Sequence, residues 1–165
     1  MTDPVMVTTG SAVVITCSTR ASAGVYPDRS GPIIVDALRG WGFEVSDAVV
    51  VADGPEVEAV LRAAISSDAV LVVTTGGTGL TPTDGTPEAT QRVVDRLVPG
   101  IAEAIRSAGV EAGVSSAILS RGICGVAGQT LVVNLPGSMG GVSSGLAVLE
   151  PIVEHALLQI RGGDH

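Results

Sequence analysis

The sequence predicts an α/β fold in which helices cover both faces of a mostly parallel β-sheet, giving three α/β/α layers. Strand-like apolar runs alternate with segments of helical spacing, and most connections are short. These runs are continuously apolar, as is typical of strands buried on both faces. The 165 residues suit one domain, and neither a linker nor a repeat divides them, so we expect a single domain over residues 1–165.

The first half of the chain predicts two strand–helix units followed by a third strand. The predicted strands span residues 12–17, 44–51 and 69–75, and the predicted helices span 32–38 and 55–65. In the second helix four apolar side chains share one face: Val57, Val60, Leu61 and Ile65. This helix therefore has an apolar stripe with which to cover a sheet.

In the second half, Thr86 and Pro87 predict a helix start, because threonine is a favoured N-cap and proline fits the first helical position. That helix is expected to reach about residue 97, before Pro99-Gly100 interrupts the chain. The remaining predicted elements are a helix over 101–108, a strand over 130–133 and a helix over 142–160.

The last predicted helix has more apolar residues around its axis than one packing face requires. Leu157 and Leu158 belong to this surplus. We expect a subunit interface to bury it.

Composition excludes several classes of protein. The net charge of -8 and the scatter of the nine basic residues argue against nucleic-acid binding. All nine are arginine, so lysine-based phosphate loops and Schiff bases are excluded. Two cysteines and two histidines do not have zinc-site spacing. Without an apolar run of ~20 residues or a signal peptide, we expect a cytoplasmic protein with reduced thiols and no membrane span.

Loops after strands carry the candidate functional residues, since ligands of open α/β sheets bind at the carboxyl ends of strands. After the first strand come Ser18, Arg20 and Arg29, which can bind an anion or simply form a solvated loop. The third strand runs into Thr75, Gly76, Gly77, Thr78 and Gly79. Glycines let backbone amides approach a phosphate closely, and the alternative is a purely structural turn.

Two aspartates and a third loop complete the candidates. Asp84 precedes the predicted helix at Thr86, and Asp53 follows the second strand, where each can bind magnesium or serve as a turn residue. The third loop leaves the strand over 130–133 and offers amide, hydroxyl and backbone groups, or is a strand-ending turn. Its candidates are Asn134, Pro136, Gly137 and Ser138, and Arg121 is a further candidate for phosphate binding.

Several separated motifs together resemble the MogA/MoaB family, which includes the gephyrin and plant Cnx G domains. The motifs are Ala21-Ser22-Ala23-Gly24-Val25-Tyr26 with Asp28 and Ser30-Gly31, Thr74 to Gly79, Asp84 with Thr86-Pro87-Glu88-Ala89-Thr90, Leu119-Ser120-Arg121-Gly122, and Asn134 to Ser138. The resemblance implies a three-layer α/β/α fold with a mixed sheet, usually a homotrimer, that binds molybdopterin.

In the MogA branch, the resemblance implies transfer of AMP from ATP, with magnesium, to the terminal phosphate of molybdopterin. Asp53 and Asp84 match essential acidic positions, and the glycine loop matches the nucleotide phosphate region. Two departures are Thr19, where the family often has aspartate, and Met139-Gly140, where it often has Pro-Lys.

Two other functions stay open: a MoaB-like protein that binds pterin or nucleotide without efficient catalysis, and an interaction scaffold such as the gephyrin G domain suggests. In the adenylylating reading, a molybdate-insertion enzyme is the expected downstream partner. The expected ligands are molybdopterin, ATP and Mg²⁺.

Overall fold

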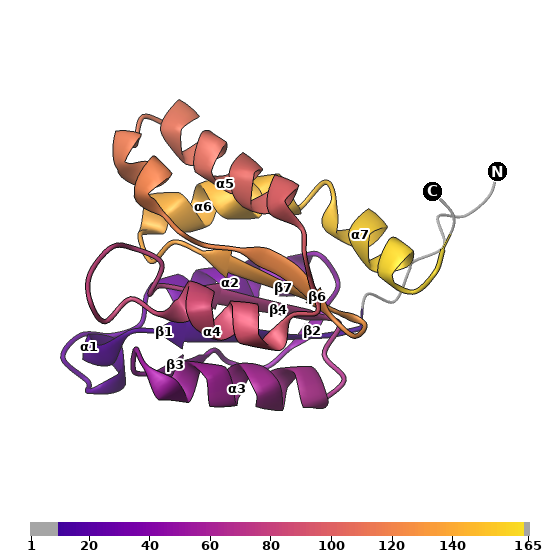
Figure 1. Ribbon diagram of the computed structural model, residues 1–165, viewed down its shortest axis with the longest axis horizontal. Helices are drawn as coiled ribbons and strands as arrows, with labels where there is room; N and C mark the ends of the chain where they lie inside the picture. The colour runs from indigo at the N-terminus through magenta and orange to yellow at the C-terminus, as the bar shows by residue number, and fades with distance from the viewer. Residues whose placement is uncertain (1–9, 164–165) are drawn as a thin grey trace.

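The computed structural model describes residues 10–163 and has a seven-stranded mixed sheet between two layers of helices (Figure 1). The strands are β1 (Ser11–Cys17), β2 (Glu44–Val45), β3 (Val49–Val51), β4 (Leu71–Thr75), β5 (Arg96–Leu97), β6 (Cys124–Ala127) and β7 (Thr130–Leu135). Their order is β2-β1-β4-β7-β6-β5, with β3 also beside β1. The pairs among β1, β2, β3, β4 and β7 are parallel, while β6 pairs antiparallel with β7 and β5. The predicted α/β fold with a mostly parallel mixed sheet is confirmed.

The helices divide between the two faces of the sheet. They are α1 (Thr19–Ser22), α2 (Ser30–Gly40), α3 (Pro55–Ser66), α4 (Thr86–Val93), α5 (Pro99–Glu111), the 3-10 helix η1 (Ser115–Leu119), α6 (Met139–Leu149) and α7 (Val153–Ile160). Side chains of α2, α5, α6 and α7 form one core with the sheet, and side chains of α3 and α4 form the other. The central strands are thus buried on both faces, as their continuous apolar runs predicted.

The strand predicted over residues 44–51 is two short strands. Both pair with β1, but Ser11 faces Glu44 whereas Ile15 faces Val49, so the outer strand carries one extra residue. Such a bulge interrupts the pairing and bends an edge strand.

The helix predicted to reach residue 97 ends at Val93, and its last residues belong to β5. Asp95 and Val98 donate backbone hydrogen bonds to Val126 and Cys124 of β6, at 2.8 and 2.7 Å. Pairing with β6, a strand that the sequence analysis missed, therefore replaces the end of the helix.

The predicted helix over 142–160 is also divided, into α6 and α7, which are bent by 59°. Pro151 lies at the break and cannot donate a helical hydrogen bond. The bend lets Leu149, Val153 and Leu157 all enter one core. Leu157 is therefore buried within the chain, and the expectation that it faces another subunit is wrong, while Leu158 is only partly buried. In the described part of the chain, only this bent pair, and no single helix, has a length and composition compatible with crossing a membrane.

We expect Leu157→Ala to lower the free energy of unfolding by about 2–5 kcal/mol, because its side chain, 3% exposed, would leave a cavity in the core. Urea unfolding measures the loss. Leu158→Ala serves as the matched control and should cost less, since Leu158 is only partly buried. An unchanged unfolding free energy in Leu157→Ala, with loss of oligomer, would restore the interface role.

Candidate functional site

Two adjoining cavities lie at the carboxyl ends of β1, β4 and β7. The larger has a volume of about 660 Å³ and is lined by the loops after β1 and β3, including Asp28, Arg29 and Asp53. The smaller, of about 300 Å³, is lined by Asp84 and by the segment from Val114 to Ser120. Both are lined by Gly76, Gly77, Gly137 and Ser138, which therefore form a shared wall.

The glycine loop after β4 is the centre of this wall. Gly76 and Gly77 have φ values of +91° and +68°, which side chains rarely adopt. A Cβ on Gly76 would collide with the carbonyl oxygen of Cys17. Both glycines are thus required by backbone conformation, and Gly76 also by its close approach to β1.

Asp53 lies on the side of the larger cavity. Its Oδ2 accepts hydrogen bonds from the backbone N and the Oγ1 of Thr19, at 3.3 and 3.2 Å, and its own backbone N donates to Thr19 Oγ1 at 3.2 Å. Its Oδ1 is buried without a hydrogen-bond partner. Thr19, a departure from the family pattern, therefore anchors one carboxylate oxygen and leaves the other available.

Asp84 lies on the side of the smaller cavity, not beside Asp53 in one cradle. Its Oδ2 accepts from the Thr81 backbone N at 3.1 Å, and a Cβ on Gly79 would stand 2.8 Å from that oxygen. Within residues 10–163, no group of three or more His, Cys, Asp or Glu side chains is arranged to hold a metal. A cation here would need oxygen ligands of another kind, such as hydroxyl, phosphate or water.

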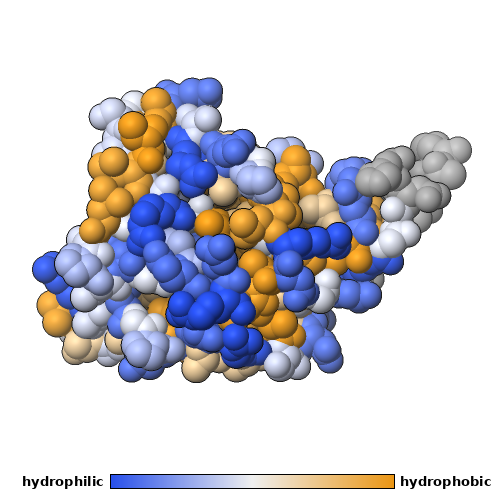
Figure 2. Space-filling view, viewed as in Figure 1, coloured by the Kyte–Doolittle hydropathy of each residue, from blue (hydrophilic) through white to orange (hydrophobic). Residues whose placement is uncertain are grey.

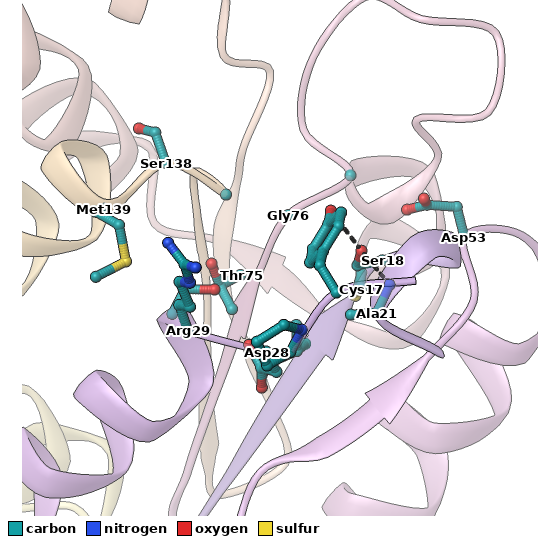
Figure 3. Close-up of a pocket in the computed structure, with 16 residues that line it drawn as sticks. Cys17, Ser18, Ala21, Asp28, Arg29, Asp53, Thr75, Gly76, Ser138 and Met139 are labelled. Atoms are coloured by element: carbon teal, nitrogen blue, oxygen red, sulfur yellow. Dashed lines mark hydrogen bonds between the residues drawn. The ribbon is translucent and has the colours of Figure 1, made fainter. Parts of the chain in front are cut away.

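The three arginines proposed as phosphate-binding candidates differ in position. Arg29 lines the larger cavity, where it extends toward Ser138 and Met139 on the opposite side of Gly76 from Asp53 (Figure 3). It has no hydrogen-bond or ion-pair partner among residues 10–163. Arg20, on α1, lines neither cavity.

Arg121 lines neither cavity, and its side chain instead binds the loop that carries Asp84. It donates to the carbonyl oxygens of Gly79 and Asp84, at 2.9 and 2.8 Å, and pairs with Glu88. This hydrogen bond lowers the pKa of Glu88. The structure thus shows Arg121 supporting the loop from outside the cavities.

Asn134 lies beneath the site. Its Nδ2 donates to Thr74 Oγ1 and Thr90 Oγ1, at 3.0 and 2.9 Å, and its Oδ1 accepts from the Ile123 backbone N at 3.1 Å. The side chain is buried and lines neither cavity, so its contacts are structural, joining β7 to β4 and α4.

The other predicted residues do surround the cavities. Ser18 and Ser138 are N-caps of α1 and α6, Thr75 Oγ1 donates to the Pro136 carbonyl at 2.8 Å, and Thr78 Oγ1 contacts Ser120 Oγ at 3.2 Å. Thr78, Gly79 and Pro136 line the smaller cavity.

The larger cavity is also lined by Tyr26, Asp28 and Met139, which the sequence analysis named only within or beside the family motifs and not as site residues. Asp28 accepts from the Gly31 backbone N at 3.0 Å and from Thr16 Oγ1 at 2.8 Å. Asp28 could have been identified from the sequence as a helix-capping residue, because it lies just before a helix, where aspartate is favoured.

Cys17 lines the larger cavity next to Gly76, and its thiol is neutral. Burial raises its pKa to about 11; a hydrogen bond with the Thr86 hydroxyl acts in the opposite direction, and the negative charge of Asp53 raises the pKa further. The thiol is thus protonated near neutral pH and is a poor nucleophile and metal ligand.

The family model for a "probable molybdopterin binding domain" matches residues 6–155. The chain belongs to this molybdopterin-binding family. Among solved structures, MogA has 50% identity and a TM-score of 0.89, covering 91% of this chain and 99% of that one. A molybdopterin biosynthesis Mog protein from Mycobacterium ulcerans has 54% identity and a TM-score of 0.87, covering 91% and 98%. The resemblance to the MogA/MoaB family is confirmed.

Curated relatives of this chain include longer proteins. The molybdenum cofactor biosynthesis bifunctional protein of Synechococcus elongatus is 43% identical over 93% of this chain, which spans 48% of that relative. The chain therefore spans about half the length of such relatives. The molybdopterin adenylyltransferase of Pyrococcus furiosus is 36% identical, with coverage of 90% of this chain and 89% of that protein.

We expect Asn134→Ala to lower the unfolding free energy by about 3 kcal/mol, because three hydrogen bonds, two of them buried, lose their partner. Chemical denaturation followed by circular dichroism measures the change. Wild-type stability combined with lost ligand binding would instead make Asn134 a direct ligand contact.

Proposed function

We propose that this chain is a molybdopterin adenylyltransferase, which transfers AMP from MgATP to the terminal phosphate of molybdopterin. Relatives of similar length bear that name. The observation that carries the proposal is the pair of cavities meeting at Gly76 and Gly77, because a transfer between two substrates needs their reacting ends to meet. Asp53 also lines the larger cavity, and Asp84 lines the smaller.

The chemistry needs positioning and charge neutralisation more than a protein acid or base. An oxygen of the molybdopterin phosphate attacks the α-phosphorus of ATP, a new P–O bond forms, and the bond to pyrophosphate breaks. Backbone amides of the glycine wall are suited to phosphate oxygens, and Arg29 supplies a cation inside the larger cavity. These groups oppose the repulsion expected from a protein of net charge -8.

Magnesium fits the residues present. Asp53 Oδ1 is a hard anionic oxygen, buried and without a partner, and Asp84 offers a second carboxylate across the wall. When bound, the ion would neutralise phosphate charge. This magnesium use remains part of the proposal, as do cytoplasmic location and delivery of the product to a molybdate-insertion enzyme.

Incubating purified protein with ATP and molybdopterin tests the proposal, which expects adenylyl-molybdopterin and pyrophosphate in equal amounts. Binding of both ligands without product would favour the MoaB-like alternative. Absence of binding would favour an interaction scaffold.

In the same assay we expect Asp84→Asn to reduce turnover about 100-fold, the order of loss for one electrostatic group, with thermal unfolding near that of the wild type. Asp36→Asn is the matched control, since Asp36 is exposed on α2 and lines neither cavity. Near-wild-type turnover of Asp84→Asn at saturating magnesium would remove Asp84 from the mechanism.

We also propose a homotrimer, with a subunit interface formed by a surface other than α7. Four apolar residues between the end of α5 and the end of η1 are each more than 40% exposed: Val110, Val114, Ile118 and Leu119. Figure 2 shows an apolar area over these elements. An exposed apolar patch of this kind is typical of a protein interface.

Light scattering at micromolar concentration should therefore give the mass of a trimer. Ile118→Asp should lower that mass by placing a charge in the patch. Val25→Asp, at a similarly exposed residue outside the patch, should not. A monomeric wild-type protein would contradict the proposal.

A further inference from the structure

The loop that carries Asp84 has no helix or strand between the end of β4 and the start of α4 (Figure 1). Residues 80–83 are exposed, and Asp84 is half-buried. Among residues 76–85, Asp84 makes hydrogen bonds only to Thr81: its backbone N donates to the Thr81 carbonyl at 3.0 Å, and its Oδ2 accepts from the Thr81 backbone N. The direction of the Asp84 carboxylate therefore depends on contacts from outside the loop.

Arg121 makes those contacts at both ends of the exposed segment. Its guanidinium donates to the carbonyls of Gly79 and Asp84. Its backbone N donates to the Thr78 carbonyl at 2.8 Å. One side chain thus joins the residue before the exposed segment to the residue after it, which reduces the conformational freedom of the chain between them.

Arg106 on α5 in turn binds the segment that carries Arg121. Its Nη1 donates to the carbonyls of Ser120 and Gly122, the residues on either side of Arg121, at 3.3 and 2.9 Å. Arg106 is half-buried, and among residues 10–163 its side chain has no ion pair. The cost of desolvating its charge is offset only by these carbonyls, so the contact indicates that the position of this segment matters.

We propose that Arg106 is a positioning residue for Asp84 and acts through Arg121. The helix that carries Arg106 is fixed to the core by Ile105, and neither guanidinium lines a cavity. The two arginines therefore act in series on the direction of the Asp84 carboxylate, where a displacement of 1 Å can cost a reaction about 100-fold. The effect on turnover rests on the proposed function, whereas the effect on the loop does not.

Amide hydrogen exchange of the protein without substrates tests the effect on the loop. We expect Arg106→Ala and Arg121→Ala each to speed exchange at Thr81 and Asp84 about tenfold, with exchange in β4 unchanged. Arg106→Lys should exchange like the wild type, because one ammonium group can donate to both carbonyls. Equal acceleration in β4 would show a loss of overall stability instead, and would overturn the proposal.

Arg92→Ala is the matched control. Arg92 is an exposed arginine that pairs with Glu58 at 2.6 Å, and it lines neither cavity. Because an exposed ion pair contributes little, loop exchange and turnover should stay within about twofold of the wild type.

Ile118→Asp separates the role of Arg106 from that of assembly. Arg106 lines a surface hollow together with Val110 and Ile118, which belong to the apolar patch proposed as a subunit interface. We expect Ile118→Asp, which keeps Arg106, to retain wild-type exchange in the loop. Acceleration equal to that in Arg106→Ala would show that assembly holds the loop, and would overturn the proposal.

In the adenylylation assay we expect turnover to fall about tenfold in Arg106→Ala and about 100-fold in Arg121→Ala. Because Arg106 acts through Arg121, the double variant should lose no more than Arg121→Ala alone. A multiplied loss of about 1000-fold would show that the two arginines act independently, against the proposal.

Unchanged loop exchange in Arg106→Ala overturns the proposal even if the protein is an active adenylyltransferase. Conversely, an inactive wild-type protein whose loop exchange depends on both arginines would reject the proposed function and leave the positioning role of Arg106 standing.

Discussion

The structure around the site depends on one steric constraint, the passage of the chain at Gly76 and Gly77 between β1 and α4. On one side stands the carbonyl of Cys17, and on the other the hydroxyl of Thr86, and neither leaves room for a side chain. The Gly76 backbone N bonds the Leu135 carbonyl at 3.1 Å, so the same passage also joins β4 to the end of β7. Only the backbone of these two glycines separates the cavities at this point, so the cavities adjoin each other there.

The same constraint explains why the two acidic residues are separated. Asp53 reaches the wall from the loop before α3 and Asp84 from the loop before α4, one toward each cavity. Separation reduces the repulsion that two carboxylates would have in one cradle. The two aspartates are also held by different residues: Thr19 binds Asp53, while Arg121 and Thr81 bind the segment that carries Asp84.

The features that could be predicted from the sequence are those that local periodicity and glycine content determine. Continuous apolar runs gave β1, β4 and β7, and the glycine-rich loop was placed correctly after β4, because both signals are local. Sequence reasoning missed β5 and β6, which are short and are defined by pairing with distant residues. Asn134 and Arg121 show the limit for side chains. Both are polar residues beside a site, and only tertiary contacts reveal that they support it from below and outside.

The parallel pairing of β4 with β7 determines when the site can form as the chain is synthesised and folds. Thr75 and Pro136 are joined by a hydrogen bond across a sequence separation of 61 residues, and the antiparallel hairpin of β6 and β7 must insert beside β4 before that bond can form. Contacts between distant segments form slowly, because closure of the intervening chain costs entropy before any contact repays it. During synthesis, a chain that has emerged only as far as β6 possesses the glycine loop and both aspartates but not the wall. Ligand recognition therefore begins only once β7 and the segment from Pro136 to Ser138 have left the ribosome.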